Sequence, residues 1–92
     1  MNLDEYSEVL KALAHPVRLK IACGLMRKEE CCVSVMVEKL QVSQPTVSQH
    51  LTILKHAKII DGFRKGNQIC YRLTNEKVKK LIEAMEINIC EQ

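Results

Sequence analysis

The stretch that most constrains this chain lies near its middle, where apolar residues recur at helical spacing beneath a row of polar ones. Val47, Leu51 and Leu54 fall at positions i, i+4 and i+7, which form one face of an amphipathic helix. Ser43 stands just before them with a hydroxyl that can accept from the first amides of a helix, and a proline suits the turn that follows. The pattern predicts a helix over residues 44–56 with one buried face and one polar face.

The residues on either side predict further short elements in a definite order. A break at His15-Pro16 separates two amphipathic helices, because the residue before a proline avoids helical backbone angles. Two short segments follow the central helix and are joined at Gly66-Asn67, a pair typical of hairpin turns. The expected elements are helices at about 6–13, 16–26, 33–40 and 44–56, strands at 59–64 and 68–73, and a last helix beginning near residue 74 or 75.

The last expected helix carries a wide apolar stripe. This stripe consists of Val78, Leu81, Ile82, Met85 and Ile89. The chain has 92 residues, of which 47% are hydrophobic but only 3% are aromatic, so a core built from this chain alone is thin. We therefore interpret residues 1–92 as one domain that forms a homodimer through an apolar helix face.

The charge of the chain is unevenly distributed. Residues 41–73 contain five basic side chains against one acidic side chain, whereas residues 1–10 contain three acids and no base. A basic middle indicates a face for a polyanion. The sequence shows neither a signal-peptide pattern nor an apolar run long enough for a membrane span. We therefore expect a cytoplasmic protein with no membrane partner, in which the five cysteines are mostly reduced thiols.

The order of these elements is that of a winged helix-turn-helix, with two short helices, a tight turn, a polar-faced helix and a basic hairpin. The predicted fold class is therefore mainly α with a small β-hairpin wing. A polar-faced helix fits the major groove of B-form DNA, and basic residues on a wing can meet the flanking phosphates. The residues predicted to contact DNA are Gln44, Thr46, Ser48, Gln49, His50, Arg64 and Lys65.

Three motifs resemble the ArsR family of winged-helix repressors, and together they span nearly the whole chain. Residues 43–54 are similar to the recognition helix of that family, residues 14–19 to the junction between its first two helices, and residues 66–73 to its wing tip and returning strand. The resemblance implies a transcriptional repressor that dimerises through its first and last helices. It also implies that an effector releases this dimer from double-stranded operator DNA.

The metal sites of that family are matched only in part. Its arsenic or cadmium site lies in a Cys-Val-Cys segment, and the matching residues here are Cys32-Val33-Ser34, so one thiolate is missing. A repositioned site for a thiophilic metal at Cys31 and Cys32 stays open as an alternative. The family's zinc or nickel site needs histidine on the last helix, and residues 75–92 contain none. We therefore expect no resident metal or other cofactor.

Two further cysteines match a subgroup of the family, the dithiol persulfide and redox sensors typified by BigR, SqrR and HlyU. Cys23 falls on the second expected helix and Cys90 near the end of the last, which is similar to the placement in those proteins. The resemblance implies that a persulfide or an oxidant links the two thiols and that the linked repressor leaves its operator. A repressor with no thiol switch is a second alternative, with Cys23 as a small core residue.

Simpler observations predict the role of the remaining cysteine and the class of the protein. Cys70 stands in the second strand of the hairpin, where it is expected to fill the core. An enzyme with a nucleophilic cysteine is not expected, because the sequence has no C-x-x-C pair and no glycine-rich loop. The sequence leaves undetermined the operator, the inducer, which of the two switch thiols attacks first, and whether Cys31, Cys32 or Cys70 reacts or binds metal.

Overall fold

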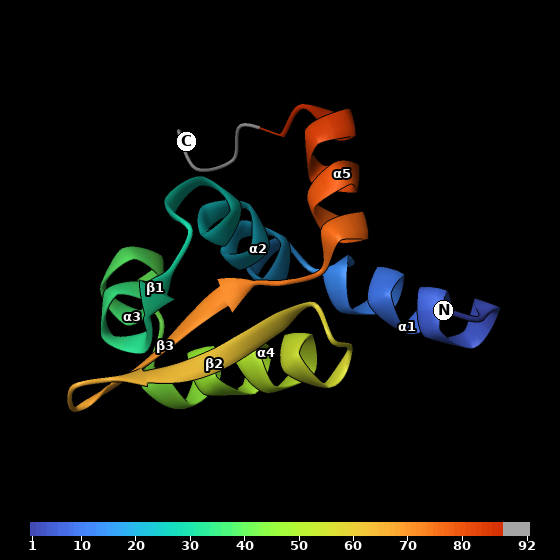
Figure 1. Cartoon of the computed structure of the whole chain (residues 1–92). Helices are drawn as coiled ribbons and strands as arrows, with labels where there is room; N and C mark the ends of the chain where they lie inside the picture. The colour runs from blue at the N-terminus through green and yellow to red at the C-terminus, as the bar shows by residue number, and fades with distance from the viewer. Residues whose placement is uncertain (88–92) are drawn as a thin grey trace.

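The computed structural model describes residues 1–87 of the chain. Within this range a small antiparallel sheet is surrounded by helices, with α1 and the tip of the hairpin at opposite ends of the molecule (Figure 1). The elements are α1 (Leu3–Leu13), α2 (Pro16–Lys28), β1 (Cys31–Cys32), α3 (Val33–Leu40), α4 (Gln44–His56), β2 (Ile60–Lys65), β3 (Gln68–Leu73) and α5 (Glu76–Met85). The winged helix-turn-helix expected from the sequence is confirmed.

Polar side chains begin most of these helices by accepting from backbone amides that have no partner within the helix. Asn2 and Glu5 form a reciprocal capping box on α1. His15 begins α2, where its Nδ1 accepts from the N–H of Val17 at 3.1 Å. Ser43 begins α4 as expected, and Asn75 begins α5 by accepting from two amides. Each cap places a helix boundary at, or within a few residues of, the position the sequence predicts.

The helix-turn-helix is formed by α3 and α4, which pack against each other across a turn of three residues. Gln41 adopts left-handed backbone angles at the end of α3, and this reverses the chain before Ser43 begins α4. The apolar face of α4 then points inward. Val47, Leu51 and Leu54 are at most 1% exposed, so the opposite face of α4 is left at the surface.

The sheet has one strand more than the sequence predicts. Its order is β1-β3-β2, with both neighbouring pairs antiparallel. The hairpin between β2 and β3 turns at Gly66, which has a positive φ that glycine adopts without steric cost. In β2, a Cβ at position 62 would lie 3.0 Å from the ring of Tyr71, so glycine permits the close approach of the two strands there. The additional strand, β1, comes just before the helix-turn-helix and joins it to the wing.

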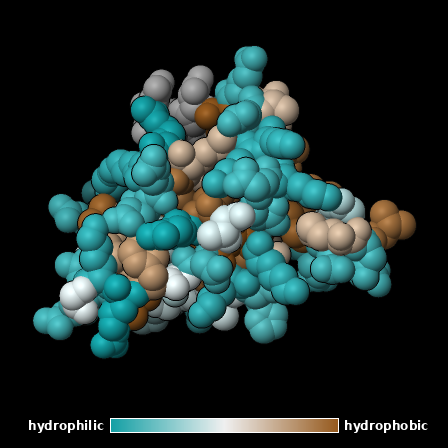
Figure 2. Space-filling view, viewed as in Figure 1, coloured by the Kyte–Doolittle hydropathy of each residue, from teal (hydrophilic) through white to brown (hydrophobic). Residues whose placement is uncertain are grey.

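The outer side of α1 leaves apolar side chains at the surface. Val9, Ala12 and Leu13 face the core, but Leu3 is 84% exposed and Leu10 is 57% exposed. Figure 2 shows this as brown surface at the end of the molecule where α1 lies. The Lys77 ammonium donates to the Tyr6 hydroxyl, which joins α5 to α1. Over residues 1–87, no helix is long and apolar enough to cross a membrane.

Candidate nucleic-acid interface and thiol sites

The polar edge of α4 carries two pairs of contacting side chains near the start of the helix. Gln44 and Gln49 are exposed, and Thr46 and Ser48 are half-buried. The Gln44 amide donates to the Ser48 hydroxyl at 3.4 Å, and the Thr46 hydroxyl lies 2.9 Å from that of Ser43. These contacts orient amide and hydroxyl groups along the first turns of α4, where the helix dipole also favours an anion. The four residues predicted for this edge therefore all lie on the part of α4 outside its buried stripe, which we call the polar strip.

His50 has different surroundings from the rest of that strip. Its Nδ1 lies 3.3 Å from Nη1 of Arg18, and its ring lies 4.7 Å from that of His15. Because a guanidinium can only donate, His50 accepts at Nδ1 and is neutral with its proton on Nε2. Burial, followed by the charges of His15 and Arg18, lowers the pKa of His50. His50 thus joins α4 to α2, and a direct contact with DNA stays a prediction.

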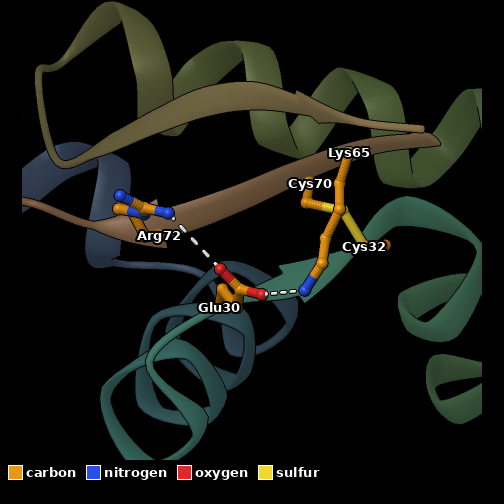
Figure 3. A network of polar contacts seen from close by, with 5 residues as sticks. All are labelled: Glu30, Cys32, Lys65, Cys70 and Arg72. Atoms are coloured by element: carbon orange, nitrogen blue, oxygen red, sulfur yellow. Dashed lines mark hydrogen bonds and ion pairs between the residues drawn. A yellow bond between two sulfur atoms is a disulfide. The ribbon is translucent and has the colours of Figure 1, made fainter. Parts of the chain in front are cut away.

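The two predicted wing cations differ in their partners. Arg64 is exposed on β2, whereas the Lys65 ammonium lies 2.6 Å from the carboxylate of Glu30 (Figure 3). The second oxygen of Glu30 lies 3.3 Å from Arg72, whose guanidinium also stacks 4.1 Å from the centre of the Phe63 ring. The hydrogen bond from Lys65 lowers the pKa of Glu30, so the carboxylate stays ionised. Sequence reasoning missed Glu30 because it lies 35 residues from Lys65.

The sheet brings two cysteines together that the sequence analysis did not pair. Cys32 on β1 lies opposite Cys70 on β3, and the two are joined by a disulfide (Figure 3). Cys70 is fully buried, as expected of a core residue, but it is bonded instead of being a reduced thiol. The difference arises because β1 has only two residues and its pairing with β3 is set by tertiary contacts, so its register is not visible in local sequence.

Cys31 faces the other way from Cys32, as neighbouring residues in a strand do. It lines a cavity of about 480 Å³ between α2 and α3, whose walls also include Lys20, Arg27, Lys28 and Lys39. Burial raises the pKa of the Cys31 thiol, although Lys28 acts in the opposite direction. Because Cys31 and Cys32 point to opposite sides, this geometry does not bring the two thiols of the alternative metal site onto one ion.

Of the two cysteines in the predicted switch, one lies within the described residues. Cys23 lies in the core on α2 and is 2% exposed. Cys90 lies outside the described residues, and so does Ile89 of the apolar stripe. Across residues 1–87 there is no group of three or more histidine, cysteine or acidic side chains that could hold a metal ion.

A polar recognition helix beside a basic hairpin defines the class of protein as a winged helix-turn-helix DNA-binding regulator. Comparison with known proteins then identifies its family. A model of bacterial regulatory proteins of the arsR family matches residues 15–61, and the chain belongs to this family. It is an ArsR-family transcriptional repressor and not an enzyme.

Individual relatives include proteins named BigR and HlyU as well as the repressor SmtB of Mycobacterium tuberculosis, which is 44% identical over 80 residues. The chain is 44% identical over 86 residues to the biofilm growth-associated repressor (BigR) of Agrobacterium fabrum, covering 94% of this chain and 73% of that protein. It is similar to the structure of HlyU from Vibrio cholerae, with a TM-score of 0.84, 30% identity and coverage of 92% and 94% of the two chains. A homodimeric winged helix-turn-helix domain from Mycobacterium bovis gives a TM-score of 0.83 at 30% identity, covering 91% of this chain and 77% of that one.

Proposed function

We propose that this repressor is a homodimer that reads operator DNA with α4 and the wing, and that it leaves the operator when Cys23 and Cys90 are linked by a persulfide or an oxidant. The observation that carries the DNA-reading part is the strip on α4. Its exposed amides and half-buried hydroxyls lie outside the stripe of Val47, Leu51 and Leu54, so they are available to base edges and phosphates. Arg64 on the wing supplies a cation for the flanking backbone.

The exposed apolar side of α1 supports the dimer. Leu3, Tyr6 and Leu10 line a groove of about 480 Å³ on the outside of α1, and Met85 is exposed at the end of α5. Apolar groups gathered in this way are typical of a surface that another protein covers. The homodimeric relative from Mycobacterium bovis has the same fold. We therefore place the contact between two copies at α1 and α5, with two recognition helices about one turn of DNA apart.

The subgroup relatives support the thiol part of the proposal. Proteins named BigR and HlyU are among its relatives, and the resemblance described above implies that Cys23 and Cys90 match the two thiols of the dithiol sensors. Because Cys23 is 2% exposed, we assign it the resolving role, in which it captures a sulfur already carried by Cys90. Linkage lowers DNA affinity only if it disfavours the DNA-binding arrangement of the dimer, and a coupling of about 1–3 kcal/mol is typical of such systems.

A DNA-shift assay on reduced protein, before and after glutathione persulfide, tests the proposal. The native chain is expected to bind operator DNA at low ionic strength and to be released by the persulfide. Cys23→Ala, which keeps the buried site apolar, is expected to bind equally well and to ignore the persulfide. Release of the Cys23→Ala protein would contradict the switch, and failure of the reduced native chain to bind any duplex would contradict the DNA-reading role.

A further inference from the structure

A second cysteine pair lies where the wing meets the helix-turn-helix. Cys32 is the residue immediately before α3, and Cys70 lies in the middle of β3. The two are directly opposite each other in the antiparallel pairing of β1 and β3 (Figure 3). Neither belongs to the Cys23 and Cys90 pair. A bond between Cys32 and Cys70 therefore joins a different part of the molecule, β1 to β3, and its effect is distinct from that of the other pair.

Non-covalent contacts span the same junction as the sulfur–sulfur bond. Glu30 joins β1 to the wing through Lys65 and Arg72. The hydroxyl of Ser34 on α3 donates to the side chain of Gln68 at 3.4 Å. The thiols are thus arranged for reaction by the fold of the sheet, and among these links the sulfur–sulfur bond is the one that oxidation makes and reduction breaks.

We propose that Cys32 and Cys70 form a reversible oxidation site for hydrogen peroxide, and that the oxidised pair locks the wing onto the helix-turn-helix without releasing DNA. Exposure determines the order of reaction. Cys32 is half-buried and Cys70 is fully buried, so the peroxide meets Cys32 first. Cys70 then acts as the resolving thiol.

The reaction balances without any further reactant. The Cys32 thiolate attacks one peroxide oxygen, the O–O bond breaks, and hydroxide leaves while Cys32 becomes a sulfenic acid. The Cys70 thiol then attacks that sulfur, the S–O bond breaks, and the oxygen leaves as water. The two thiols together lose two electrons and two protons, and one hydrogen peroxide is reduced to two molecules of water. A dithiol reductant reverses the bond by exchange.

The position of the bond predicts that DNA binding continues after oxidation. The tether joins β1 to β3, whereas the polar strip lies on α4 and Arg64 lies on β2, so none of the reading groups is drawn away. The inference rests on the proposed function only for this DNA readout, because the formation of the bond does not depend on it.

The test uses the full chain with the other pair removed, as Cys23→Ala/Cys90→Ser, so that only the sheet pair and Cys31 can react. Hydrogen peroxide is expected to remove two hydrogen atoms from the intact mass, with Cys32 and Cys70 linked in the peptide map. The midpoint of thermal unfolding is expected to rise by about 15 °C or more, because the bond closes a loop between residues 38 apart in sequence. Operator affinity is expected to be unchanged.

Single changes in this background separate the sheet pair from its neighbour. Cys32→Ser is expected to abolish both the mass change and the rise in midpoint, whereas Cys31→Ser, the adjacent thiol on the cavity side, is expected to keep both. A peptide map that links Cys31, or a treated protein without the Cys32–Cys70 link, would overturn the site. Release of DNA by peroxide in this background would overturn the locking role. If the reduced protein bound no DNA, the proposed function would fail while mass and midpoint still decided the oxidation site.

Discussion

The two ends of this molecule differ in how far contacts within one chain cover their side chains. At the wing end, the strands pair with each other, Glu30 joins two cations, and Cys32 is bonded to Cys70. At the opposite end of the molecule (Figure 1), where α1 lies, Leu3 is 84% exposed and Leu10 is 57% exposed. The wing end is therefore held together by contacts within one chain. The α1 end has apolar surface that a second copy would cover.

This difference matches the tasks of the two ends in the proposed function. An isolated helix of 11 residues is marginal in water, so α1, with Leu3 and Leu10 exposed, gains stability from a partner. The DNA-reading end has to keep its side chains in register with a rigid duplex, and contacts within the chain serve that purpose. Changes at the two ends should consequently affect assembly at one and salt-dependent DNA binding at the other.

The largest effect is expected from Leu10→Glu on α1. The change places a carboxylate in the middle of the apolar groove, where a second copy would have to bury it without a partner. The dimer should dissociate, and operator affinity should fall by about 100-fold or more, because two linked half-sites bind far more tightly than one. Sedimentation velocity and a DNA-shift assay measure the two effects.

Leu10→Met is the matched control, since it keeps the size and apolar character of the side chain. It should retain both the dimer and the affinity. If Leu10→Glu stayed dimeric with native affinity, α1 would not be the interface, and the contrast between the two ends would be lost.

A smaller effect of opposite sign is expected from Glu30→Gln at the wing end. The native carboxylate holds Lys65 by a contact of 2.6 Å and places a negative charge near the predicted path of the DNA backbone. Removal of that charge releases Lys65 toward phosphate. Operator affinity should rise by a few-fold. The slope of log affinity against log salt concentration should steepen by up to about one unit.

Arg64→Gln provides the comparison for that change, because it removes an exposed wing cation without altering the contacts of Glu30. Arg64→Gln should weaken binding to every DNA sequence alike. It should also reduce the slope of log affinity against log salt concentration by about one unit. Weaker binding by Glu30→Gln would show instead that Glu30 positions Lys65 for the DNA, and that the ion pair does not compete with phosphate.

The smallest effect concerns His50, which lies between the two ends on α4. Burial, then His15 and Arg18, lower the pKa of His50 below its ordinary value of 6.5. The unfolded chain therefore binds this proton more readily than the folded chain does. The stability that neutral His50 contributes is fully present above pH 6.5 and declines as the pH falls toward the folded pKa. His50→Gln should flatten the pH dependence of the unfolding midpoint between about pH 7 and pH 5. The exposed His56→Gln should not, and equal slopes in both variants would contradict this assignment.

The helices were predictable because their signals are local. The helices over 33–40 and 44–56 and the strand over 68–73 coincide with α3, α4 and β3, where caps, prolines and apolar spacing lie within a few residues of each boundary. The predicted second helix ends two residues early, because the charged end of α2 has no apolar pattern. The two-residue strand β1 was missed since so short a segment has no period to detect.

The candidate site was predictable only in its outward-facing parts. The strip from Gln44 to Gln49 followed from the inward positions of Val47 and Leu51, because one helix face determines the other. The surroundings of His50 were not foreseen, since Arg18 lies 32 residues away in sequence. The pairing of Glu30 with Lys65 was hidden for the same reason.

The amino-acid sequence by itself determined the order of the elements, the polar edge of α4 and the family of the protein, because those depend on spacing and motifs along the chain. Tertiary structure alone decided that Cys32 meets Cys70 while Cys31 faces a cavity, and that Lys65 is held by Glu30. These contacts depend on the register of β1 against β3. That register is set by packing between segments almost 40 residues apart, and no local pattern encodes it.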